Sequence, residues 1–407
     1  MRAISSLLVL AVAGCTAIDN FDKFKVGDGG MAGGCTPGCT CIAANASLGV
    51  PEHCAIMPSN GLSCAGITHS IDTVTLTGGD YVIDTSQTPP VLTLLGSPVA
   101  TGTLTSNGTA LFCIGAMVTS APSRIAIAGS HPVAIVADSV VRFSGTISLA
   151  GLYASSEKGA SGVAGGGPGA DHETNGPGPS GGKAGSGIPG SGGSGAGGTM
   201  SGANGGVTMN TSLPPPGGSS AGTVLVGFGG GGGGKGTTVG GGGGGGGGAL
   251  QITASWQIAL DQAQINASGG GGAGGGPGSS ATTGAGGGGG GGSGGSIFLE
   301  APDVSVNGGC LSVIGGPGGA GGASLRGGDA HATPMCGFIG MGGTTGPMGG
   351  PGGTPNGITP SGGPGTGVGG GGGGSGSFGR VVIRTHMPPM MLSSVVPTSA
   401  YFPSTLP

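Results

Sequence analysis

Nine cysteines are the side chains best suited to chemistry in this sequence of 407 residues. The first of them, Cys15, ends the string Val12-Ala13-Gly14-Cys15, which follows Arg2 and an apolar stretch from Ala3 to Ala11. Small residues before the cysteine fit the pocket of a signal peptidase, and the thiol can take a diacylglycerol before cleavage makes it the new N-terminus. The pattern predicts a lipoprotein signal peptide over residues 1–14, with lipidation at Cys15. The alternative is an ordinary cleaved signal peptide in which the cysteine is unmodified.

The predicted lipid determines the location that we expect. The apolar stretch is too short to span a bilayer stably, whereas two or three acyl chains would anchor the chain firmly. Thr16 follows the cysteine in place of the Asp that retains many lipoproteins at an inner membrane. We therefore expect an exported chain, bound through its lipid to the outer membrane or cell surface. Residues 15–34 carry Asp, Lys and Gly without a period, as expected of a tether.

The other eight cysteines favour disulfides, because an even number in an oxidising compartment usually pairs. Five of them crowd into a Cys-rich segment, 35–64, so at least one bridge should leave that segment if all eight pair. The pairings we expect are Cys64 with Cys113 and Cys310 with Cys336. The full set of candidates is Cys35, Cys39, Cys41, Cys54, Cys64, Cys113, Cys310 and Cys336.

A zinc site is the rival interpretation of the Cys-rich segment. Its ligands would come from Cys35, Cys39, Cys41, His53 and Cys54. Structural zinc modules usually show two separated CxxC-like pairs, whereas here the spacing is C-x3-C-x-C followed by a long gap. We expect no metal and no cofactor.

Short runs of alternating apolar residues recur along the chain. Each copy contains three such runs within about twenty residues, at Pro132–Gly151, Gly248–Gly269 and Gly295–Gly315, and a truncated copy follows at Phe378–Thr385. A period of two predicts strands with one inward face. Three short strands with small corners make one coil of a β-solenoid, and coils must stack because one coil cannot bury its inward face alone. We therefore predict an all-β fold, a parallel β-solenoid (β-helix) over residues 65–385.

Less regular runs upstream are expected to form further coils. They are Thr73–Thr77, Tyr81–Asp84, Val91–Leu95, Ala110–Val118 and Arg124–Ala128. The last segment, 386–407, is rich in Pro, Ser and Thr, and we expect it to leave the body as an extended segment or to form a cap.

Glycine makes up 110 of the 407 residues and is concentrated in insertions after the third strand of each copy. The insertions span about 152–247, 269–294 and 316–376, and each ends in a run of glycines. Their shared position predicts one architecture with side extensions. Two arrangements are open: a flexible brush, or packed polyglycine II helices with three residues per turn that exchange backbone hydrogen bonds.

Four segments of the chain resemble those of a known group of proteins. They are the lipobox at Cys15, the blocks GGGALQITAS (246–255) and GGSIFLEAPDVSVNGG (294–309), and the closing SFGRVVIRT (377–385). The chain resembles the glycine-rich surface lipoproteins of myxobacteria, often labelled PE-PGRS-like. The resemblance covers most of the chain after about residue 110 and implies an architecture more than an activity. The helical N-terminal domain of the mycobacterial proteins is missing here.

Few residues point to catalysis. Only 6% of the residues are charged and 3% aromatic, without a basic stripe, so we expect no nucleic-acid partner. If the copies stack, Asp138 and Asp303 could meet at the first corner, although an Asp at a corner usually caps a turn. Trp256, expected on a strand, is either a sugar-stacking platform or a wall residue. The histidines show no metal spacing; they are His53, His69, His131, His172, His331 and His386.

The sequence therefore favours a structural or adhesive cell-surface lipoprotein without catalysis. Its partners would be the membrane, through the lipid anchor, and extracellular matrix, polysaccharide or other cell-surface molecules. Two alternatives are a carbohydrate-active β-helix enzyme, and binding of ice or another hydrated surface by a polyglycine face.

Overall fold

The structure is a computed structural model with two compact units, Met1–Ala55 and Ile56–Pro407, which are described separately below. The boundary falls inside the predicted Cys-rich segment. The described residues are 41–58, 60–65, 72–177, 180–187, 189–208, 238–278, 284–331, 340–343, 361–367, 369–386, 395–396 and 400–405. Cys15, Cys35, Cys39, His69 and Cys336 lie outside them.

The described part of the first unit is a small antiparallel pair of strands. β1 (Cys41–Ile42) pairs with β2 (His53–Cys54), which places Cys41 opposite Cys54. A short 3-10 helix, Ala46–Leu48, lies between the strands and ends at Gly49, whose φ of 67° suits a residue without a Cβ.

The second unit is all-β, as predicted, and its three sequence copies each form a set of three strands, here called a rung. The first rung consists of β9 (Val133–Ala137), β10 (Val140–Phe143) and β11 (Gly145–Ser148). The second rung consists of β12 (Ala249–Ala254), β13 (Gln257–Asp261) and β14 (Gln264–Asn266). The third rung consists of β15 (Ser296–Glu300), β16 (Asp303–Asn307) and β17 (Cys310–Ser312).

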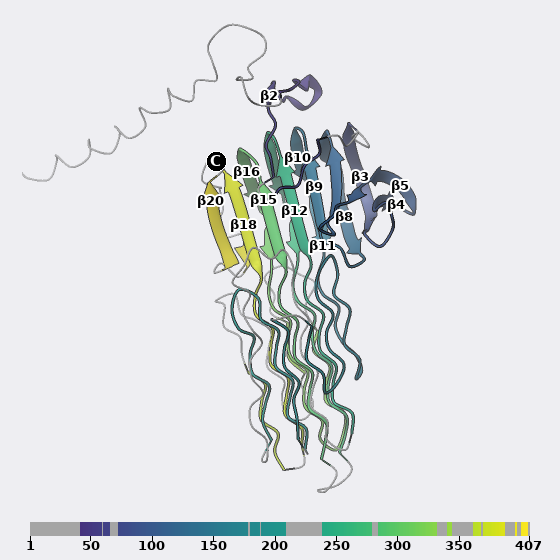
Figure 1. Ribbon diagram of the computed structural model, residues 1–407, viewed down its shortest axis with the longest axis vertical. Coiled ribbons are helices and arrows are strands. Elements are labelled where there is room, and N and C mark those ends of the chain that lie inside the picture. Colours follow the sequence, from purple (N-terminus) through teal and green to yellow (C-terminus); the bar gives the residue numbers. More distant parts are fainter. Residues whose placement is uncertain are drawn as a thin grey trace, which may run out of the picture. The chain divides into compact units, whose positions relative to one another are not determined.

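Neighbouring rungs pair in parallel and in register. Ile135 lines up with Ile252, Ile252 with Leu299, and Leu299 with Ile383 of β18 (Arg380–Thr385). The second strands pair in the same order, and so do the third strands. Figure 1 shows the first strands of the rungs side by side. The prediction that the copies stack is therefore confirmed.

At the N-terminal end of the stack, two long strands replace separate short ones. β3 (Thr73–Asp84) pairs in parallel with β8 (Ala116–Ala128), with a register shift between Leu76 and Thr77. β8 in turn pairs with both β10 and β11. β7 (Ala110–Ile114) pairs in parallel with β9.

The expected coil around Val91–Leu95 is wrong. This region forms antiparallel strands instead: β4 (Val91–Leu94), β5 (Ser97–Thr101) and β6 (Thr103–Leu104). Leu95 and Gly96 both have positive φ, 49° and 81°, which is the conformation of a tight hairpin turn. The turn reverses the chain before it can complete a coil.

The described parts of the C-terminal tail, 395–396 and 400–405, pair with the body. β19 (Val395–Val396) pairs in parallel with β17, and β20 (Tyr401–Thr405) pairs in parallel with β18. Of the two arrangements expected for the tail, the described strands therefore fit the cap and not the extended segment that leaves the body. Their position is supported by burial at this end of the stack, with Val395 2% and Ala400 0% exposed.

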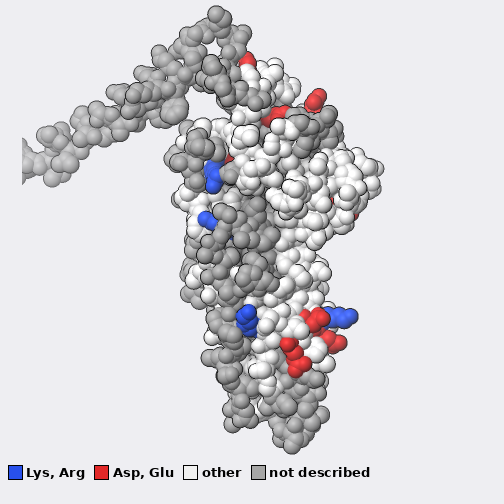
Figure 2. Space-filling view, viewed as in Figure 1, with Lys and Arg blue, Asp and Glu red and all other residues white. Residues whose placement is uncertain are grey.

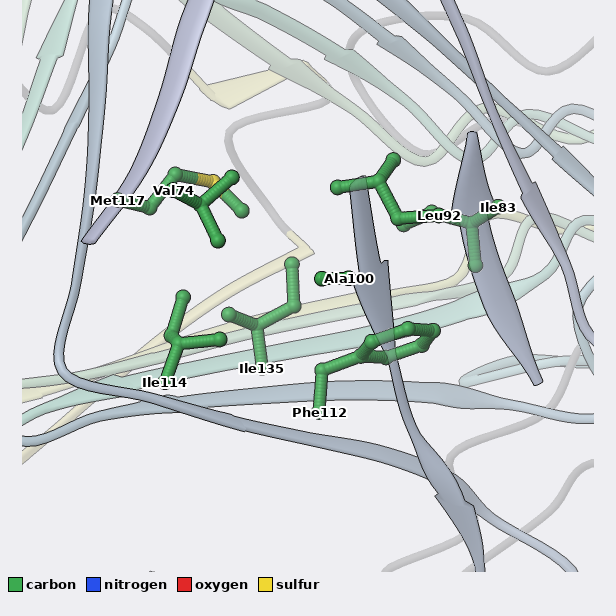
Figure 3. Close-up of a pocket in the computed structure, with 8 residues that line it drawn as sticks. All are labelled: Val74, Ile83, Leu92, Ala100, Phe112, Ile114, Met117 and Ile135. Carbon is green, nitrogen blue, oxygen red and sulfur yellow. The ribbon is translucent and has the colours of Figure 1, made fainter. Parts of the chain in front are cut away.

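The inward faces of the rungs form one apolar core. It consists mainly of Val, Ile, Leu and Ala, as the alternation predicted, with a few aromatic side chains such as Phe143. A small apolar cavity lies near the N-terminal end of the stack (Figure 3). It is lined by Val74, Ile83, Leu92, Ala100, Phe112, Ile114, Met117 and Ile135.

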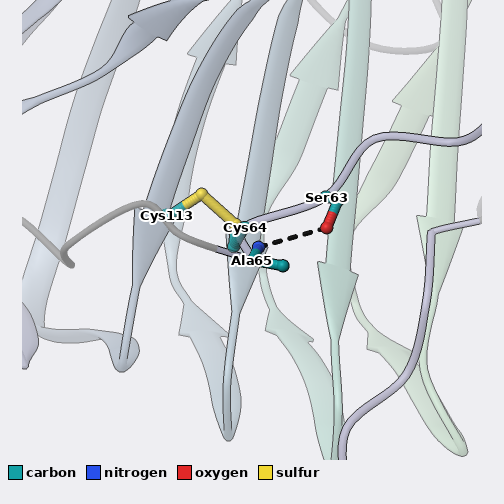
Figure 4. Close-up of a disulfide and its surroundings, with 4 residues drawn as sticks. All are labelled: Ser63, Cys64, Ala65 and Cys113. Atoms are coloured by element: carbon teal, nitrogen blue, oxygen red, sulfur yellow. Dashed lines mark hydrogen bonds between the residues drawn. A yellow bond between two sulfur atoms is a disulfide. The ribbon is translucent and has the colours of Figure 1, made fainter.

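The expected Cys64–Cys113 disulfide is present and ties an N-terminal segment to β7 (Figure 4). Leu62 packs beside it against Leu111, Ala134 and Val136 on the outer face of the sheet. Cys41, Cys54 and Cys310 are also disulfide-bonded. The expected partner of Cys310, Cys336, lies outside the described residues.

Replacing Ile252 by Ala should lower the free energy of unfolding by about 3 kcal/mol, because Ile252 is 1% exposed at the centre of the stack. Chemical denaturation of the purified chain measures this. Val82→Ala, which shortens a side chain that is 38% exposed, is the matched control and should change little. An equal loss for both variants would show that Ile252 does not face a packed interior.

The double substitution Cys64→Ser and Cys113→Ser should lower the free energy of unfolding by up to about 4 kcal/mol, because the bridge closes a loop with a sequence separation of 49. Denaturation with and without reductant measures the difference. Ser63→Ala leaves the bridge intact and serves as control. If the double variant were as stable as the parent, the bridge would not constrain the unfolded chain.

Candidate functional site

The glycine-rich insertions leave the rungs from their third strands and return to the first strands of the next rung. We call 149–156, 267–278 and 313–323 the outgoing legs, and 240–248, 284–295 and 369–379 the returning legs. Figure 1 shows these chains running side by side, away from one end of the strands. Together with the chains that pack on them, they form what is here called the glycine slab.

Each of the first two returning legs donates backbone hydrogen bonds to the next one at every third residue. Gly241, Gly244 and Gly247 donate to the carbonyl oxygens of Gly287, Gly290 and Ser293, each at 2.9 Å. The next pair of returning legs repeats the pattern, with donors at 288, 291 and 294 and acceptors at 371, 374 and 377. The bonded residues rise together along the chain, so these legs run parallel, like the strands that they join.

The same leg donates in two further directions. Gly242, Gly245 and Gly248 donate to 156, 152 and 149 of the first outgoing leg, which runs antiparallel. Gly243, Gly246 and Ala249 donate to 170, 167 and 164 of another antiparallel segment. Successive N–H groups of this leg therefore point to three different neighbours in turn, and the order repeats every three residues. Only a chain with about three residues per turn can do this.

Close approach explains why these positions are glycine. A Cβ built on Gly244 would lie 2.0 Å from the carbonyl oxygen of Gly270, and one on Gly289 would lie 2.0 Å from that of Gly242. Because the obstacles are backbone atoms of hydrogen-bonded neighbours, they cannot move aside without breaking the slab. Of the two arrangements left open by the sequence, the described legs adopt the packed one.

Charge is sparse on the surface of the molecule. Figure 2 shows a face on which Lys, Arg, Asp and Glu are few. A hydrogen bond from Ser86, with one from Gln87, lowers the pKa of Asp84, and burial raises the pKa of Tyr401. Neither residue lies on a glycine leg.

The stack does not bring Asp138 and Asp303 together. Asp303 lines up with Gln257, and Gln257 with Val140, so the second rung separates the two acids. With neighbouring strands about 4.8 Å apart, backbones two rungs apart are separated by roughly 10 Å. The Asp303 carboxylate instead accepts a hydrogen bond of 2.7 Å from the Gln257 side chain. The expected carboxylate pair is therefore wrong, because the copies stack in chain order.

Trp256 does not lie on a strand. It lies between β12 and β13, where its backbone N–H donates to the carbonyl oxygen of Ser139. The residue is 36% exposed. The prediction of a strand position is wrong because the alternating apolar residues end at Ala254 and resume at Ile258.

The described histidines are scattered. His53 is buried in the first unit. The backbone N–H of His131 donates to the Thr85 hydroxyl, and that of His386 donates to the carbonyl oxygen of Pro302. His172 lies 4.0 Å from Glu173, and the His331 ring contacts Tyr153. Among the described residues, no three His, Cys, Asp or Glu side chains gather closely enough to hold a metal ion. In the same residues, no helix is long and apolar enough to cross a membrane.

A buried polar cluster around Glu300 was not predicted from the sequence. Glu300 is 1% exposed and accepts hydrogen bonds from Gln251 at 2.8 Å and from Thr253 at 3.1 Å. Arg384 lies 3.6 Å from its other oxygen. Aligning ALQITA, SIFLEA and RVVIRT would have revealed it, because Thr253, Glu300 and Arg384 occupy the same place in successive rungs. The cluster ties three first strands together on their outer face.

Comparison with known proteins gives no relative from which a role could be transferred. No protein-family model, curated protein or solved structure matches the chain.

Gly244→Ala should lower the free energy of unfolding by about 2 kcal/mol, because the new methyl group would overlap a backbone oxygen of the neighbouring leg. Denaturation of the purified chain measures the loss. Ser201→Ala, at an exposed position on the slab, is the control and should be neutral. A neutral Gly244→Ala would mean that the legs do not pack as described.

Proposed function

We propose that the chain is a structural or adhesive cell-surface lipoprotein, anchored through Cys15, in which a β-solenoid holds up a slab of polyglycine II helices. The residues 15–34 then act as the tether, and the slab is the surface that meets a matrix, a polysaccharide or another cell. No catalysis is part of this proposal.

The spacing of the hydrogen bonds in the returning legs carries the proposal. Donors at every third residue, directed at three different neighbours, are the pattern of packed helices with three residues per turn. Such a slab is rigid, because each leg is bonded on several sides. It also presents a surface with few charges and few long side chains, which is suited to broad contact more than to chemistry on a small molecule.

The rungs support the solenoid part of the proposal. Three short strands per rung, each paired in parallel with the same strand of the next rung, bury an inward face that no single rung could bury alone. The resemblance to myxobacterial glycine-rich lipoproteins supports the same interpretation. The position of the predicted lipobox supports the anchor.

Cys15→Ser should abolish palmitate incorporation and membrane retention when the full chain is expressed in a bacterial host that processes lipoproteins. Whole-cell adhesion to matrix-coated surfaces and cell–cell aggregation measure the function itself. We expect both to fall at least severalfold in Cys15→Ser and in the double variant Gly244→Ala with Gly289→Ala.

The control for the slab is Ser201→Ala, which should adhere like the parent. Undiminished adhesion by slab variants that are shown to be disrupted would contradict an adhesive role for the slab. Palmitate incorporation in Cys15→Ser equal to that of the parent would contradict the anchor.

A further inference from the structure

One surface of the glycine slab carries large side chains. Leu152 and Tyr153, on the first outgoing leg, are 53% and 54% exposed. At slab positions such as Gly244 and Gly289 even a Cβ would overlap a neighbouring backbone, so side chains of this size do not fit there. Tyr81 is buried in the core, whereas Tyr153 presents its ring to solvent.

The ring of Tyr153 is held in a defined place. It meets the ring of His331 edge to face, with centroids 4.8 Å apart and planes 68° apart. His331 forms an antiparallel bridge with Met341, which is 70% exposed. The backbone of the leg is fixed on both sides of the tyrosine, because Ala154 donates to Gly271 and Gly245 donates to Leu152.

An ion pair is attached to the same two segments as the aromatic pair, at Ser155 and Asp329. Arg326 donates to Asp329 at 2.7 Å and 3.2 Å, and also to the carbonyl oxygen of Ser155 at 2.8 Å. Asp329 accepts a further hydrogen bond of 2.8 Å from the N–H of Gly274, so the pair is attached to the slab. The Arg326 side chain remains 43% exposed. The two charges of this ion pair cancel, so it offers planar polar groups without adding net charge.

We propose that Tyr153, His331, Arg326 and Asp329 form a binding site for an uncharged polysaccharide. An exposed aromatic ring packs well on the C–H face of a pyranose. Guanidinium donors, carboxylate acceptors and an imidazole that both donates and accepts match hydroxyl groups, which do both. The ion pair adds no net charge of its own, which favours an uncharged polymer over phosphorylated or uronic acid polymers. The inference rests on the proposed adhesive function and names its partner.

Two assays of the purified full chain in detergent test this site. The first is sedimentation with insoluble cellulose or chitin, and the second is affinity electrophoresis in gels that contain dextran. Alginate is the acidic comparison. We expect retention by at least one of the three uncharged polymers. Tyr153→Ala and Arg326→Ala should each weaken it about tenfold, as expected for one stacking or charge-assisted contact. Met200→Ala, which removes another exposed apolar side chain (48%), is the control and should bind like the parent. Thermal unfolding of every variant should match that of the parent.

Retention by none of the uncharged polymers, retention by alginate alone, or binding that Tyr153→Ala leaves unchanged would overturn the site. These outcomes are separate from those for the proposed function. If disrupting the slab abolishes cell adhesion while no uncharged polymer binds, the adhesive function stands and this site falls. If Tyr153 is required for polymer binding while slab variants adhere normally, the site stands and the adhesive function falls.

Discussion

Backbone hydrogen bonding between neighbouring rungs is the constraint on which the rest of the molecule depends. The strands of successive rungs pair in parallel and in register, and the glycine legs continue from the same strands. Gly247 and Ser293 are bonded just before their chains enter β12 and β15, which pair in the same register. Ordering glycine costs more backbone entropy than ordering any other residue. The strands already fix one end of each leg in register. The contacts within the slab therefore have to offset less of this entropy cost.

The two parts of the second unit are stabilised in different ways. The rungs bury Val, Ile, Leu and Ala in a core, where the hydrophobic effect dominates. The legs have few apolar side chains, so they depend on close contact and on hydrogen bonds that are each worth about 1 kcal/mol net. Both ends of the stack are closed by irregular elements: antiparallel hairpins at one end, and at the other a strand that contains Pro403, which lacks an N–H for a further partner. The proposed solenoid thus supplies the hydrophobic core that stabilises the unit, and the proposed polyglycine slab supplies the surface for contact with a partner.

Much of the fold was predictable because the strands follow a simple period. Alternation at Leu250, Ile252 and Ala254 identified both the strand and its buried face, and the recurrence of the copies predicted their stacking. The turn at Leu95-Gly96 was not recognised, because it lacks the Asn-Gly or Asp-Gly pair that usually signals such a hairpin. The packing of the glycine legs could not be predicted from composition, because only contacts between segments far apart in sequence distinguish a slab from a brush. The same limitation hid the place of Tyr153 beside His331.

Amide hydrogen exchange of the native chain tests the central claim most directly. The account predicts that amides of the returning legs, such as those of 241–248 and 287–294, exchange slowly, with protection close to that of the adjoining strands β12 and β15. Exchange of these glycines at the rate of an unstructured chain, while the strands stay protected, would contradict it.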